Sequence, residues 1–161
     1  MNTRTAIRRI KKYRPTTPAE FKDAGVPLGR LVGSGVFREV VRVKGCDLVV
    51  KFPLDDGGYR DGRMHTTVEL RKLKKLAEYP WMRRYLPKVH YHDPKSGVLV
   101  MRYYPRFKNY EDQIEGLGNL IRVLLRRITG VNISDIHCEN IRNGTGPEPE
   151  NYLPILCDLG Y

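Results

Sequence analysis

Three runs rich in β-branched residues, separated by two glycine-containing turns, are the feature that most limits how this chain can fold. They lie in the stretch LGRLVGSGVFREVVRVKGCDLVVKF, where GSG and KGCD interrupt the apolar runs. Turn residues between short β-branched runs are typical of antiparallel strands joined by hairpins. The pattern predicts strands over residues 28–32, 36–43 and 47–52.

Strand and helix patterns alternate along the rest of the chain. KVHYHD and GVLVMRYYP predict two more strands, joined by a turn at DPKSG. Apolar residues recur at helical spacing in HTTVELRKLKKLAEY and in YEDQIEGLGNLIRVLLRRITG, where Gly130 ends the second helix. ENIRN and LPILCD predict two short strands. The sequence therefore predicts a strand-rich region followed by a helical one.

Basic residues are in excess and unevenly placed. Lys and Arg number 29 against 18 Asp and Glu, for a net charge of +11, and no acid precedes Pro15. Such charge favours an acidic protein, nucleic acid or a phosphorylated ligand as partner. A solvated surface with a loose arm is the alternative, because no known nucleic-acid-binding motif accompanies the charge. We interpret residues 1–18 as a basic arm or a short helix.

The absence of targeting signals and the number of cysteines indicate where in the cell a protein of this kind would be found. No apolar run approaches the roughly 18 residues that a membrane span needs, and the N-terminus lacks the apolar core of a secretory signal. We therefore expect a cytoplasmic protein with no membrane partner. Cys46, Cys138 and Cys157 lack the number and spacing of a disulfide framework or a zinc site. For His90 and His92 we favour edge-strand surface over a metal site.

A glycine-rich turn in VGSGVFREV is the first candidate for binding chemistry. Gly33, Gly35 and Val40 match the pattern G-x-G-x-x-G-x-V, with Ser34 between the glycines and Arg38 in place of the third glycine. Glycine permits the turn and lets backbone N–H groups approach an anion closely. An ordinary hairpin turn is the alternative interpretation.

Lys51 and Glu69 follow the glycine-rich turn. Lys51 ends the third predicted strand among apolar neighbours, where a lysine needs an anionic partner. Glu69 shares a helix face with Leu73 and Leu76, which would direct it toward the sheet. The alternative for Glu69 is a capping box with Thr66.

Asp135, Asn140 and Asp158 complete the set of candidate residues. The first two have the spacing D-x-x-x-x-N in SDIHCENI, and Asp158 ends an apolar strand in CDLG. Asn140 and Asp158 carry oxygen ligands suited to Mg²⁺, and Asp135 can accept a hydroxyl proton. Phosphoryl transfer needs such a metal, a lysine on the phosphates and a carboxylate that positions the attacking hydroxyl.

In this order the motifs resemble those of the protein kinase superfamily, from about residue 28 to residue 160. The matching segments are the glycine-rich loop VGSGVFREVVRV, the strand lysine of LVVK, the helix TTVELRKL, the hinge LVMRYYP, the catalytic loop SDIHCENI and the metal-binding CDLG. The resemblance implies an α+β, two-lobed fold with a five-stranded antiparallel sheet and one helix in its N-lobe. Beyond the basic arm over residues 1–18 that the composition indicates, it implies an N-lobe over 19–104 and a reduced helical C-lobe over 105–161.

The resemblance also implies roles for individual residues. Lys51 would pair with Glu69 and with the α and β phosphates of ATP, Asp135 would be the catalytic base, and Asn140 and Asp158 would hold Mg²⁺. The nucleotide would meet Gly33, Ser34, Gly35, Val40, Lys51, the gatekeeper Met101 and backbone groups of Arg102, Tyr103 and Tyr104. The implied activity is transfer of the γ-phosphate of Mg·ATP to a hydroxyl acceptor, on a protein or a small molecule.

Departures from the family pattern leave other functions open. Ile133 and Ser134 replace the His-Arg pair before the catalytic Asp, and no A-P-E segment follows the D-L-G. With these departures, the resemblance implies a minimal, atypical serine/threonine kinase-like protein. The alternatives are a pseudokinase or regulatory module that binds nucleotide or a partner without turnover, and a basic binder of nucleic acid or acidic protein. The apolar face of the helix over 112–129 is a candidate dimer or partner surface.

Overall fold

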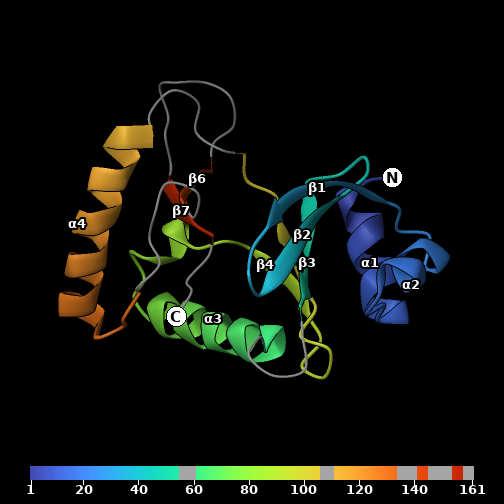
Figure 1. The fold of residues 1–161 in the computed structure, drawn as a ribbon, viewed down its shortest axis with the longest axis horizontal. Coiled ribbons are helices and arrows are strands. Elements are labelled where there is room, and N and C mark those ends of the chain that lie inside the picture. Colours follow the sequence, from blue (N-terminus) through green and yellow to red (C-terminus); the bar gives the residue numbers. More distant parts are fainter. Residues whose placement is uncertain (55–60, 106–110, 134–140, 145–153, 158–161) are drawn as a thin grey trace. The chain divides into compact units, whose positions relative to one another are not determined.

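The computed structural model describes residues 1–54, 61–105, 111–133, 141–144 and 154–157. The chain divides into two compact units, one of residues 1–67 with 88–103 and one of residues 68–87 with 104–161. Strands and helices both contribute, so the fold class is α+β, as predicted (Figure 1). Among the described residues, no helix is both long and apolar enough to cross a membrane.

A five-stranded antiparallel sheet forms the centre of the first unit. Its order is β1-β2-β3-β5-β4, and each neighbouring pair is antiparallel. All five strands were predicted, each to within a few residues at its ends. They are β1 (Leu28–Ser34), β2 (Arg38–Val43), β3 (Leu48–Pro53), β4 (Val89–His92) and β5 (Leu99–Arg102).

Two helices, α1 (Thr3–Tyr13) and α2 (Pro18–Asp23), pack on one face of this sheet (Figure 1). Asn2 caps α1 by accepting a hydrogen bond from the Thr5 N–H at 2.8 Å. Ala6 and Ile10 are fully buried in the same core as Val50 and Val100 of the central strands. Of the two interpretations of the N-terminus, the short helix is therefore the one observed.

Helix α3 (Gly62–Ala77) begins earlier than the sequence pattern predicted. Asp61 accepts a hydrogen bond from the Met64 N–H at 2.9 Å and so caps the helix. Thr66 lies inside the helix, where its hydroxyl donates to the Gly62 carbonyl at 3.0 Å. The alternative of a capping box between Thr66 and Glu69 is therefore wrong, because the helix is already formed before Thr66.

The second unit has its own apolar core. Helix α4 (Glu111–Thr129), the 3₁₀ helix η1 (Arg83–Tyr85) and the antiparallel pair β6 (Ile141–Asn143) and β7 (Pro154–Leu156) belong to it. Leu76, Leu125, Ile133 and Ile141 are buried together there. Gly130 ends α4 with a φ of 67°, in the left-handed region that favours glycine, as the sequence predicted.

Candidate functional site

One row of residues across the first unit's sheet brings several predicted site residues onto the same face. Gly33 pairs with Val40, Val40 with Lys51 and Lys51 with Leu99. Residues that pair across antiparallel strands point to the same side. In β3, Leu48 and Val50 alternate with Lys51 and pack in the core that contains α1. The row of Gly33, Val40 and Lys51 therefore lies on the sheet face opposite that helix.

Lys51 is buried on this face. Its relative exposure is only 4%, and its strand neighbours Val50 and Phe52 are buried as well. Removing an ammonium group from water is unfavourable unless anionic or strongly polar groups surround it. Burial of this lysine, which the apolar pattern of the strand predicted, places an amine on the sheet face that also carries Gly33 and Val40.

Gly33 and Gly35 are not required by the backbone around them. Neither has a positive φ. A Cβ built at Gly33 would lie 3.8 Å from Val40, and one at Gly35 would lie 4.0 Å from the Arg38 carbonyl, so both would have room. The hairpin itself is closed by the Gly35 N–H, which donates to the Arg38 carbonyl at 2.9 Å. Turn geometry therefore does not account for the two glycines at these positions.

Arg38 stands where the kinase pattern has its third glycine, and it lies inside the fold. Its side chain is almost fully buried, at the first position of β2. Next to it, Phe37 stacks on the His65 ring with centroids 4.8 Å apart. Where a glycine would leave space after the turn, the Arg38 side chain is therefore packed inside the first unit.

The predicted hinge begins at the end of β5. Met101 is fully buried and pairs with Val49 on the face that carries Lys51. The Arg102 N–H donates to the Lys88 carbonyl at 2.9 Å, and the Tyr103 N–H donates to the Asp47 carbonyl at 3.0 Å. These two backbone donors are thus used within the first unit. Contact of this segment with a base stays a prediction.

Glu69 is fully buried on α3, and Leu73 and Leu76 of the same helix face are buried as well. The prediction that this face points inward is confirmed. A buried carboxylate needs a positive or hydrogen-bonding partner, since an isolated one is strongly disfavoured. The pairing of Glu69 with Lys51, which the family resemblance implies, stays a prediction.

The remaining predicted residues cannot be placed in the same way. Asp135, Asn140 and Asp158 lie outside the described residues, so their roles stay predictions. In the described part of the chain, no group of three or more His, Cys, Asp or Glu side chains could hold a metal ion. Cys46 and Cys157 are half-buried, and burial raises the pKa of the Cys46 thiol.

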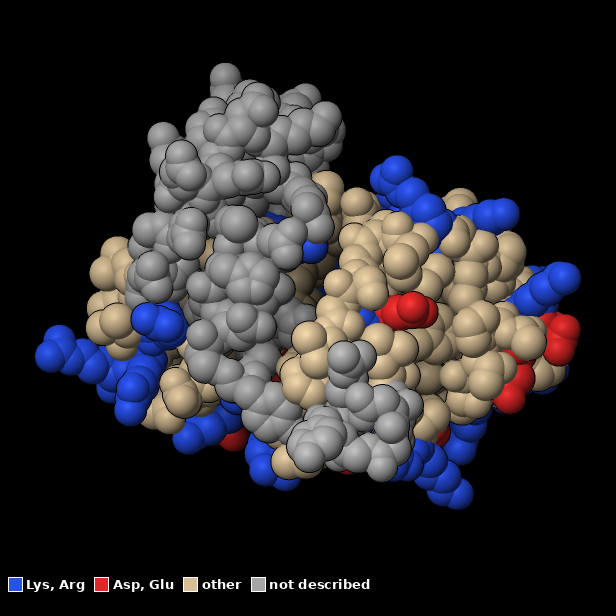
Figure 2. Space-filling view, viewed as in Figure 1, with Lys and Arg blue, Asp and Glu red and all other residues tan. Residues whose placement is uncertain are grey.

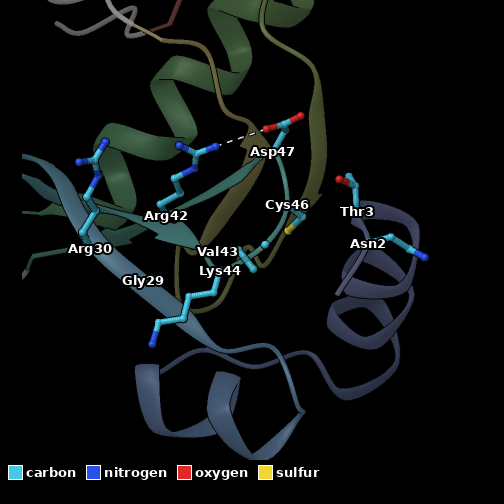
Figure 3. Close-up of a pocket in the computed structure, with 10 residues that line it drawn as sticks. Asn2, Thr3, Gly29, Arg30, Arg42, Val43, Lys44, Cys46 and Asp47 are labelled. Atoms are coloured by element: carbon cyan, nitrogen blue, oxygen red, sulfur yellow. Dashed lines mark hydrogen bonds and ion pairs between the residues drawn. The ribbon is translucent and has the colours of Figure 1, made fainter.

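A surface hollow of about 650 Å³ between the start of α1 and the β2–β3 turn was not predicted. It is lined in part by Arg30, Arg42, Lys44 and Asp47 (Figure 3). Arg42 is already engaged, because its guanidinium lies 3.4 Å from the Asp47 carboxylate and 4.1 Å from the centre of the Tyr103 ring. Lys44 points away from the other two basic side chains. The positive groups do not converge, so this hollow lacks the geometry of an anion site.

The surface charge agrees with the composition. On the face drawn in Figure 2, Lys and Arg side chains project from both units, and Asp and Glu are few among the described residues. The exposed Lys and Arg side chains are therefore not confined to one of the two units. Charge distributed in this way supports weak attraction to polyanions more than it supports a shaped nucleic-acid site.

Comparisons with known proteins find likeness in structure only. No protein-family model matches the sequence, and no curated protein does. PpkA-294 in its apo form is similar with a TM-score of 0.48 and 17% identity, over 82% of this chain and 57% of that one. The APH(2″)-IIa ternary complex with streptomycin and ATP is similar with a TM-score of 0.42 and 17% identity, over 71% of this chain and 38% of that one.

A choline/ethanolamine kinase family protein from Mesorhizobium loti is also similar, with a TM-score of 0.38 and 25% identity, over 74% of this chain and 35% of that one. The chain is therefore similar in structure to parts of these three proteins. It spans 57%, 38% and 35% of the length of these three proteins. Because all three TM-scores lie below 0.5, support for a function has to come from the residues of the chain itself.

Proposed function

We propose that this protein is a kinase-like phosphotransferase that binds Mg·ATP and transfers its γ-phosphate to a hydroxyl acceptor, on a protein or a small molecule. The observation that carries the proposal is Lys51, buried on the sheet face that also holds Gly33 and Val40 in register. A buried amine, an open glycine turn and an apolar side chain in one row suit a phosphate-bearing nucleotide.

The described residues fit the nucleotide in their chemistry. Gly33, Ser34 and Gly35 would let the phosphates approach the backbone closely, because both glycines have space above the backbone. Val40 would contact the base. Lys51 would neutralise the α and β phosphates and would be held by Glu69, which is itself buried.

Met101 would limit the depth available to the adenine as gatekeeper. Contacts from the backbone of Arg102, Tyr103 and Tyr104 would have to use groups other than the Arg102 and Tyr103 N–H, since both of these donate within the first unit. This predicts that the base is held by fewer backbone donors than the motif alone would suggest.

The acceptor step is assigned to the residues of the catalytic-loop motif. Asp135 would orient the acceptor hydroxyl and take its proton while the acceptor oxygen bonds to the γ-phosphorus and ADP leaves. Asn140 and Asp158 have the oxygen donors that Mg²⁺ prefers, and the ion would neutralise charge on the β and γ phosphates. Positioning and charge neutralisation account for most of the rate in such reactions.

Transfer of labelled γ-phosphate from Mg·ATP tests the proposal. The full chain is incubated alone and with total cell extract, next to Asp135→Asn, Asp158→Asn and the exposed α2 control Asp23→Asn. Label should appear with the wild type and the control and disappear in both site variants. Label that persists in Asp135→Asn and Asp158→Asn would contradict the assigned roles.

Thermal unfolding with and without Mg·ATP separates the alternatives. A rise in melting temperature without transfer would favour a regulatory, nucleotide-binding module. If neither transfer nor a rise is observed, the remaining alternative is a basic binder of nucleic acid or acidic protein.

Gly35→Ala should reduce the rise in melting temperature caused by ATP while changing the free energy of unfolding by less than about 1 kcal/mol. Gly62→Ala is the matched contrast, because a Cβ there would meet the Phe37 carbonyl and, at 2.7 Å, Leu54 backbone atoms. It should destabilise the protein itself by roughly 1–3 kcal/mol.

A further inference from the structure

Over residues 120–129, helix α4 has two apolar faces, and one of them is exposed. Leu125 and Thr129 face the core of the second unit, with Ile121 packed against it. Leu120, Leu124 and Ile128, spaced by four residues, form a second row on the helix surface. With Val123, their exposures range from 44% to 55%. A helix that bordered only water would carry polar residues at these positions.

The second row borders a groove. A cavity of about 350 Å³ lies between α4, the residues around η1 and β7. Met82, Leu125 and Leu156 are buried and form its floor, and the exposed Leu124, Ile128 and Trp81 also line it. Apart from the Tyr85 hydroxyl and the Trp81 indole N–H, the lining side chains are apolar. Exposed apolar grooves of this kind are typical of surfaces that bind another protein segment.

The surroundings of the groove are positively charged. Arg127 is exposed on α4 between Leu124 and Ile128, and Arg83 and Arg84 are exposed on η1. Arg84 lies against Tyr85, a lining residue, with its guanidinium 5.3 Å from the ring centre. Among the described residues of this unit whose burial is known, Glu78 is the only exposed acid. A segment that fills the groove would therefore gain from acidic residues beside its apolar ones.

We propose that the groove between α4 and η1 binds an amphipathic helix of a partner protein, with an apolar stripe flanked by acidic residues. An apolar stripe at helical spacing would cover Leu124, Ile128 and Trp81, and the flanking carboxylates would meet Arg127 and the η1 arginines. A second copy of this chain fits less well. A two-fold contact through the same surface would place arginines opposite arginines.

Trp81 supplies a direct measurement, because it is the only tryptophan in the chain and it lines the groove. The probe is a synthetic helix of about 18 residues, or five turns. It has leucines at i, i+3, i+4 and i+7, glutamates beside them and no tryptophan. Titration into the full-length protein should shift the Trp81 emission to shorter wavelength in a saturable manner. A twin peptide with lysine in place of glutamate should bind at least about tenfold more weakly.

Variants locate the binding and keep the fold intact. Leu124→Ala and Ile128→Ala should each weaken binding of the glutamate peptide about tenfold, whereas Val123→Ala, equally exposed but outside the groove lining, should leave it unchanged. Arg127→Glu should weaken binding of the glutamate peptide and strengthen that of the lysine peptide. All four replace exposed residues, so unchanged melting temperatures are expected.

Three outcomes would overturn the proposal. One is no saturable change in Trp81 emission up to about 100 μM peptide, a concentration that detects even weak complexes. The second is equal binding of the glutamate and lysine peptides. The third is a dimer of the protein alone at micromolar concentration that Leu124→Ala dissociates, which would assign the groove to a second copy. None of these outcomes depends on ATP, so they are independent of the proposed phosphotransfer.

Discussion

At the scale of single residues, buried charge was the most predictable property of the site. Lys51 and Glu69 were both expected among apolar neighbours, and both are buried. Strand alternation and helix periodicity are sufficient for such predictions, because they depend only on local geometry. Burial of Arg38 could not be predicted in this way. A charged residue beside a turn is normally exposed, and only the tertiary surroundings decide otherwise.

His92 provides a residue-scale prediction about pH. Its Nε2 is buried with no hydrogen-bond partner, and burial lowers the pKa of the imidazole from 6.5 in spite of nearby Asp93. Above pH 6.5 the ring is neutral in both the folded and unfolded states. As the pH falls through 6.5, the unfolded state takes up the proton first, so the free energy of unfolding should decrease until the folded pKa is passed.

Urea denaturation between about pH 7.5 and pH 5 measures this effect, which for one proton cannot exceed about 1.4 kcal/mol per pH unit. The His92→Phe variant should lose part of the decrease. His90 should still contribute, since burial lowers its pKa as well. Wild-type and His92→Phe stabilities that stay parallel over the whole range would show that the folded and unfolded pKa values of His92 are equal.

At the scale of elements, the strands and long helices were predictable and the N-terminal helices only partly so. Thr17, Pro18 and Glu20 carry the start signal of α2 in the sequence: Thr17 accepts from the Glu20 N–H at 3.3 Å, and Pro18 occupies the first turn. A helix of six residues is too short to show an apolar period, so periodicity alone does not predict it. For α1, the basic composition suggested a solvated arm, although the spacing of Ala6 and Ile10 fits a buried face.

The integration of α1 into the first unit leads to a prediction at this scale. Ile10 is fully buried against the sheet, so Ile10→Ala should lower the free energy of unfolding by about 2–5 kcal/mol. Arg8→Ala, an exposed position on the same helix, should change it by less than about 0.5 kcal/mol. Urea unfolding followed by circular dichroism gives both values. Equal and small effects would mean that α1 leaves the sheet in solution.

At the scale of the whole molecule, the division into two units limits how much of the candidate site could be predicted from the sequence. Each unit has its own apolar core. The sequence identified the residue types that a nucleotide site needs, and the structure brings Gly33, Val40 and Lys51 into one row. Asp135, Asn140 and Asp158 follow in the second half of the chain and lie outside the described residues. Local sequence pattern can therefore predict which candidate residues share one face of a sheet. Whether the residues of the sheet meet those of the second half of the chain depends on contacts between segments distant in sequence.

The net charge of +11 gives the last prediction, which separates polyanion attraction from nucleotide binding. Charge dispersed over exposed Lys and Arg side chains acts through counterion release, so binding of a labelled single-stranded oligonucleotide should fall at least about a hundredfold between 50 and 200 mM salt. Binding of Mg·ATP next to Lys51 should respond far less, because a lysine that is 4% exposed is poorly screened. The rise in melting temperature with Mg·ATP should therefore persist at 200 mM salt, and excess oligonucleotide should not abolish it. Oligonucleotide binding that resists salt and competes with ATP would instead identify the basic surface as the functional site.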